Sequence, residues 1–101
     1  MNFSLSPDAY DDLDEIDAWV SEHFGPTFAE KTHARLFDEF ELLTEFPQMG
    51  RQRPEISSRP IRFFFSSHYW IIYEPNLELG VPLIIHRVVH AARDLYGLGL
   101  G

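Results

Sequence analysis

The side chains best suited to chemistry are four cations in the second half of the chain: Arg62, Arg87, His90 and Arg93. A group of arginine and histidine side chains on a sheet can bind phosphate or stabilise a transferring phosphoryl group. The same group can equally bind the acidic side chains of a partner protein. For Arg93 there is also a structural alternative, a local ion pair with Asp94 that would fix the end of the chain.

Other groups with common catalytic or metal-binding roles are absent or badly placed. The chain has no cysteine, which excludes a zinc–thiolate site and a thiol nucleophile. His86 and His90 are four residues apart, but in a strand this spacing only places them on one face, so we expect no metal site and no cofactor. The acidic residues at the start of the first expected helix should form a solvated face rather than a catalytic carboxylate pair: Asp11, Asp12, Asp14 and Glu15.

Charge is distributed unequally along the chain. The 101 residues carry 16 acidic and 8 basic side chains, a net charge of -8, and their number favours one domain over residues 1–101. The first fifty residues hold 12 acidic and two basic side chains, whereas the rest has a small positive balance. The acidic total argues against direct DNA binding by this chain alone. Because the apolar runs are short and no signal peptide is evident, we expect a cytoplasmic protein without membrane contact.

The first half has the periodicity of two α-helices. Ser6, Pro7 and Asp8 are typical of a helix start, and the Gly25-Pro26 joint ends this helix and begins the next, which predicts an antiparallel hairpin. Phe46-Pro47 ends the second helix. Residues at spacings of three and four, all apolar except Thr32, predict the buried faces of the two helices: Leu13, Ile16, Val20 and Phe24 in the first, and Ala29, Thr32, Leu36, Phe40 and Leu43 in the second.

Strand patterns occupy the rest of the chain. Residues 61–66, 69–73 and 83–89 are rich in aromatic and β-branched side chains, and Pro75-Asn76 closes the second run. The short connections predict antiparallel pairing. Residues 2–5 predict an additional first strand, and residues 97–101 predict a frayed tail.

Five stretches in order resemble ParE-type toxins of the RelE/ParE superfamily. Phe46–Arg51 is close to the family's FPxMGR motif, and Arg87–Leu95 is close to its RVLHGARDL motif. The other three stretches are Ser6–Ala9, Asp12–Ile16 and the Gly25-Pro26 joint followed by Ala29. The resemblance implies an α+β fold in which a helical hairpin packs on a small twisted antiparallel sheet, in the order β-α-α-β-β-β.

The resemblance also implies a function. The protein would be the toxin of a type II toxin–antitoxin module, neutralised by a cognate ParD-like antitoxin in a hetero-oligomer. ParE-like members are linked to inhibition of DNA gyrase, whereas RelE-like members cleave mRNA on the ribosome. Under this interpretation Arg62, Arg87, His90 and Arg93 are the candidates for toxicity and target binding, and no catalytic residue is expected.

Charge favours the gyrase-directed branch. A ribosome-dependent nuclease needs cations around its phosphate, and this acidic chain has one lysine, Lys31. The nuclease alternative stays open, because Arg62, Arg87 and His90 are cationic and Tyr96 can replace the tyrosine common near the end of such nucleases. A third alternative is an inert interaction protein of the same fold.

Three aromatic residues are the candidates for antitoxin binding: Trp19, Phe37 and Trp70. Large aromatic side chains are frequent at binding hot spots, and an antitoxin segment that folds on binding would lay an amphipathic helix on them. Each can instead belong to the core, because a domain of this size must bury much of its aromatic content.

Overall fold

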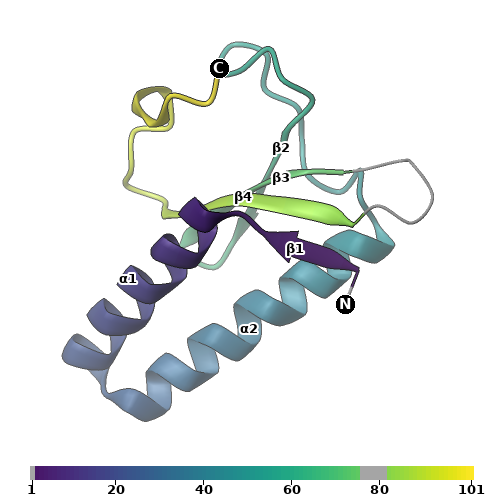
Figure 1. Ribbon diagram of the computed structural model, residues 1–101. Helices are drawn as coiled ribbons and strands as arrows, with labels where there is room; N and C mark the ends of the chain where they lie inside the picture. Colours follow the sequence, from purple (N-terminus) through teal and green to yellow (C-terminus); the bar gives the residue numbers. More distant parts are fainter. Residues whose placement is uncertain (1, 76–81) are drawn as a thin grey trace.

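Two long helices form a hairpin that covers one face of the sheet. A computed structural model describes residues 2–75 and 82–101, with α1 at Pro7–Phe24 and α2 at Pro26–Glu45 (Figure 1). Ser6 caps α1, because its Oγ accepts a hydrogen bond from the Ala9 N–H at 3.1 Å and donates to the carbonyl of His86 at 2.8 Å. Gly25, with φ of 92°, separates the helices in a conformation that favours glycine. The predicted hairpin is confirmed.

Most residues of the predicted buried faces are buried, but Ile16 and Thr32 are only partly buried and Phe24 is exposed. Leu13 and Val20 of α1 are buried, as are Leu36, Phe40 and Leu43 of α2. Phe24 was expected on the buried face, but 61% of it is exposed. The prediction was wrong because Phe24 ends α1 at the tip of the hairpin, which extends past the edge of the sheet (Figure 1).

The sheet consists of β1 Phe3–Leu5, β2 Arg62–Ser66, β3 Tyr69–Glu74 and β4 Leu83–His90, in the spatial order β1-β4-β3-β2. The three antiparallel strands lie within a residue or so of the predicted ones, although the predicted closing residue Asn76 lies outside the described residues. The first strand pairs in parallel with β4, with Phe3 opposite Leu83. The α+β prediction is confirmed, with a mixed rather than purely antiparallel sheet.

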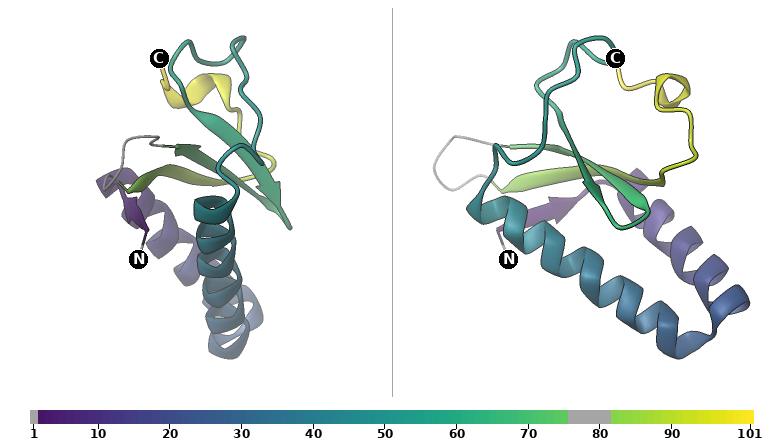
Figure 2. Two further views of the ribbon diagram at one scale, coloured as in Figure 1. Left: turned by 90° about the vertical axis from the view of Figure 1, so that its right-hand side faces the viewer. Right: turned by 180° about the vertical axis from the view of Figure 1, so that it is seen from behind.

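A second layer covers the opposite face of the sheet. It consists of the loop after α2 and the C-terminal segment with its 3-10 helix η1, Tyr96–Leu98, and both lie on the side away from the hairpin (Figure 2). Apolar side chains of this layer and of the sheet form a core separate from the one under the helices: Ile61, Phe63, Ile72, Val89, Leu95 and Leu100. Among the described residues, neither helix combines the length and hydropathy that crossing a bilayer requires.

The predicted frayed tail is instead docked. Leu100 is buried in the second core, and Ser57 Oγ donates a hydrogen bond to its carbonyl at 3.1 Å. The Ser58 N–H donates to the carbonyl of Gly101 at 3.0 Å. The prediction was wrong because the two leucines between the terminal glycines have apolar surface to cover on this face of the sheet.

Candidate functional site

Arg87 is held by a carboxylate of α1. Its Nε and Nη2 donate to the two oxygens of Asp12 at 2.7 and 2.9 Å, and the Val88 N–H donates to the same carboxylate at 2.9 Å. The hydrogen bond to Asp12 raises the pKa of Arg87, which stays charged at any physiological pH. Asp12 was expected on a solvated face, and that prediction was wrong: it is buried because it reaches the edge of β4 beyond the end of β1.

Arg62 lies elsewhere in the sheet. Strand β3 separates β2 from β4, so Arg62 and Arg87 are on strands that do not pair. Arg62 Nη1 donates to the carbonyl of Gly50 at 2.7 Å and so fixes the loop after α2. The four predicted cations therefore do not form one cluster.

His90 and Arg93 do lie together, at the end of β4. Both are exposed, and both line one hollow of about 530 Å³. A turn joins them: the Arg93 N–H donates to the His90 carbonyl at 2.9 Å, and the Ala92 N–H donates to His90 Nδ1 at 3.1 Å. The alternative ion pair between Arg93 and Asp94 is not formed, and the Asp94 carboxylate instead accepts the Tyr96 N–H at 3.0 Å.

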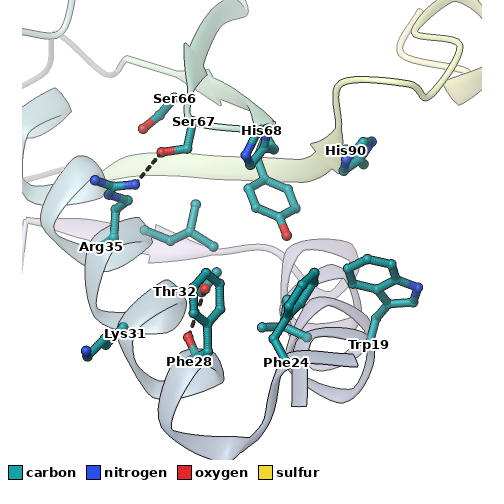
Figure 3. Close-up of a pocket in the computed structure, with 13 residues that line it drawn as sticks. Trp19, Phe24, Phe28, Lys31, Thr32, Arg35, Ser66, Ser67, His68 and His90 are labelled. Carbon is teal, nitrogen blue, oxygen red and sulfur yellow. Dashed lines mark hydrogen bonds between the residues drawn. The ribbon is translucent and has the colours of Figure 1, made fainter. Parts of the chain in front are cut away.

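A larger groove of about 680 Å³ lies between the helical hairpin and the β2–β3 turn (Figure 3). Its helical side carries three exposed aromatic residues, Trp19, Phe24 and Phe28. Their rings form a row with centroid separations of 5.8 and 5.4 Å. On the sheet side Ser67, with φ of 57°, makes the tight turn that places His68 above the helices. The groove is an apolar surface with a polar rim.

The groove and the hollow are continuous. Trp19, Tyr69 and His90 line both of them, so the aromatic row leads directly to the exposed pair His90 and Arg93. An exposed, largely apolar surface of this kind on a small domain is typical of an interaction site or a ligand-binding groove.

The three predicted aromatic candidates lie on three different surfaces. Trp19 is in the groove. Phe37 packs edge-on against Phe3 at 5.9 Å, beside the first core, and Trp70 lies with the second core on the opposite face of the sheet. A role of Phe37 and Trp70 in antitoxin binding stays a prediction.

Sequence reasoning missed Phe24 and Phe28 as surface residues. Helical periodicity assigned Phe24 to the core and gave Phe28 no role. A usable signal was present, because the two flank the Gly25-Pro26 joint, where a hairpin runs past whatever it packs against.

The fold is that of a small α+β protein with an exposed apolar groove, and its described residues include no group of three or more histidine and acidic side chains that can hold a metal ion. The sequence model of one family, described as the ParE toxin of the type II toxin–antitoxin system parDE, matches residues 3–95. The chain therefore belongs to the ParE toxin family, and the resemblance of its motifs is confirmed. No curated protein matches it.

A solved structure supports the fold. The chain is similar to one in the structure titled "Chromosomal ParDE TA system from P. aeruginosa", with a TM-score of 0.70 and 20% sequence identity. The match covers 89% of this chain and 95% of the other. At this identity the likeness shows a shared fold.

Proposed function

We propose that this ParE-family toxin acts in the cytoplasm by inhibiting DNA gyrase, and that a ParD-like antitoxin neutralises it in a hetero-oligomer. One observation carries the proposal: the exposed aromatic groove is continuous with the exposed pair His90 and Arg93. His90 and Arg93 would contact the target. Arg62 and Arg87, which are bonded to Gly50 and Asp12, would hold the loop and strand that frame this surface.

The shared residues give a physical route to neutralisation. An antitoxin segment seated on Trp19 and Tyr69 would also cover His90, because all three line both depressions. Antitoxin and target would then compete for one surface, and neutralisation would need no change of conformation.

The toxic activity is tested with purified gyrase. The protein should inhibit supercoiling of a relaxed plasmid, and Arg93→Ala should relieve the inhibition by tenfold or more in the concentration required. Arg51→Ala is the matched control, since Arg51 is also an exposed arginine but lines neither depression. Unimpaired supercoiling together with cleavage of mRNA on translating ribosomes would establish the nuclease alternative instead. Unchanged growth on overproduction without antitoxin would point to the inert alternative.

Neutralisation is tested with the antitoxin encoded beside this chain. Phe28→Ala should weaken the complex by tenfold or more, because its exposed ring is part of the groove. Tyr10→Ala removes a similarly exposed aromatic ring on α1, outside both depressions, and should change the affinity less than twofold. Equal losses for the two variants would contradict the assignment of the groove.

A further inference from the structure

The groove has a charge opposite to that of the chain. Its thirteen lining residues include Lys31, Arg35, His68 and His90 but no aspartate or glutamate. The chain as a whole has twice as many acidic as basic side chains, and Lys31 and Arg35 are the only two basic residues among its first fifty. The charge of the groove lining is therefore opposite in sign to the charge of the chain as a whole.

Lys31 and Arg35 are available for a partner. They are four residues apart, so they lie on one face of α2 (Figure 3). Within residues 2–75 and 82–101 neither is paired with a carboxylate, whereas Arg53, Arg59 and Arg87 each have such a partner. Arg35 donates one hydrogen bond to Ser67 Oγ at 2.7 Å, which fixes the guanidinium at the rim and leaves its other donors free.

The aromatic row has the spacing of a helix surface. Ring centroids of Trp19, Phe24 and Phe28 are 5.8 and 5.4 Å apart. Side chains three or four residues apart on an α-helix are separated by about 5–6 Å, so successive apolar residues of one helical face can meet successive rings.

We propose that the groove receives an acidic amphipathic helix of the antitoxin. Its apolar face would lie on Trp19, Phe24 and Phe28, and carboxylates along one flank would pair with Lys31 and Arg35. This inference rests on the proposed neutralisation and adds the chemistry of the segment that performs it. Charge-assisted bonds at the rim would fix the direction and register of the helix, while the rings supply most of the affinity.

A single strand of RNA fits the surface less well. Aromatic rings beside cations can bind single-stranded nucleic acid, but such a strand carries one negative charge per nucleotide. Beyond the groove it would meet the carboxylates of α1, including Glu15 in the adjoining hollow. A short helix confines its carboxylates to the cationic side, and at physiological salt screening over about 8 Å weakens repulsion from the rest of the chain.

The test reverses single charges and measures binding of the antitoxin encoded beside this chain by titration calorimetry. Lys31→Glu and Arg35→Glu should each weaken the complex by tenfold or more. Arg51→Glu makes the same change of charge outside the groove and should weaken it less than twofold. Lys31 makes no side-chain hydrogen bond within the described residues, so its variant should unfold at the temperature of the wild type. A compensating Glu→Lys change in the antitoxin should restore binding to Lys31→Glu.

The outcomes separate the inference from the function on which it rests. If the antitoxin binds and all three reversals behave alike, the acidic helix is excluded while neutralisation stands. If the antitoxin does not bind the wild-type protein, the proposed neutralisation itself fails. Tight binding of a 12-nucleotide single-stranded RNA, lost in both Lys31→Glu and Arg35→Glu, would overturn the inference in favour of nucleic acid.

Discussion

The carboxylate of Asp12 completes the hydrogen bonding of β4 beyond the end of β1. Pairing between the strands ends with Leu5 opposite Ile85, and Asp12 then accepts the Val88 N–H and both donors of Arg87. A side chain of α1 thus accepts the backbone hydrogen bond that a longer β1 would have accepted from β4. The partners are 75 positions apart in the sequence, which is why helical periodicity alone placed Asp12 on a solvated face.

Asp12→Asn should destabilise the fold strongly. The amide can still accept the Val88 N–H, but Arg87 loses its counter-charge, and breaking a largely buried pair costs about 3–5 kcal/mol. Urea unfolding at neutral pH measures the loss. Asp14→Asn removes an exposed carboxylate of the same helix and should change the free energy of unfolding by less than about 0.5 kcal/mol. Equal effects of the two changes would show that the ion pair with Arg87 adds no more to stability than an exposed carboxylate of the same helix does.

Tyr73 connects β3 to the loop that carries the FPxMGR-like motif. Its hydroxyl donates to the Pro47 carbonyl at 2.7 Å and accepts the Gly50 N–H at 2.8 Å. A Cβ atom on Gly50 would lie 2.7 Å from this hydroxyl and 3.1 Å from the Phe63 carbonyl, so only glycine allows the approach. The motif glycine has a packing role.

Tyr73→Phe should lower the free energy of unfolding by about 1–3 kcal/mol, because it removes both hydrogen bonds of the hydroxyl and leaves the buried Gly50 N–H without a partner. Burial raises the pKa of Tyr73, so its phenolate is disfavoured in the folded state. The wild type should therefore lose stability as the pH rises from about 10 through this raised pKa, since the unfolded tyrosine ionises first. Phenylalanine does not ionise, so the variant lacks this loss of stability. The difference in free energy of unfolding between the wild type and Tyr73→Phe, measured by urea unfolding, should therefore become smaller above pH 10. A constant difference across that range would contradict the assignment.

At the scale of elements, the sequence predicted those helices and strands that depend on residues close together in the chain. The hairpin and the three antiparallel strands follow from helical periodicity, the Gly25-Pro26 joint and the alternation of apolar side chains. The parallel pairing of β1 with β4 depends on contacts between the two ends of the chain, which no local pattern contains. For the same reason, the sequence did not show that Arg62 and Arg87 are already hydrogen-bonded within the chain, to Gly50 and Asp12.

The C-terminal tail was predicted to be frayed but is docked, and its contribution to the free energy of unfolding can be measured. Leu100→Ala should lower the free energy of unfolding by about 2–4 kcal/mol, because Leu100 is 8% exposed and completes the second core. Leu98 is only partly buried beside that core, so Leu98→Ala is the matched control with a smaller loss. Thermal unfolding followed by circular dichroism compares them. A tail that frays in solution would make the two losses equally small.

At the scale of the whole molecule, opposite charges occupy separate surfaces. Helix α1 carries a series of exposed carboxylates at successive spacings of three residues, where like charges repel: Asp8, Asp11, Asp14 and Asp17. The groove beside it has cations and no carboxylate among its lining residues. The net charge of -8 therefore does not describe the groove, although the adjoining hollow is lined by Asp12 and Glu15.

This separation predicts that salt changes folding and binding in opposite directions. Raising NaCl from about 10 to about 150 mM shortens the screening length from about 30 to about 8 Å. Repulsion along α1 then weakens, and a gain of about 1 kcal/mol in stability would raise the melting temperature by about 4–8 °C. The same salt should weaken the antitoxin complex, because it screens attraction to Lys31 and Arg35. Replacing Asp14 and Asp17 by asparagine should reduce the gain in melting temperature and leave the salt dependence of binding unchanged. A melting temperature that falls with salt would show that attraction, rather than repulsion, dominates the surface of α1.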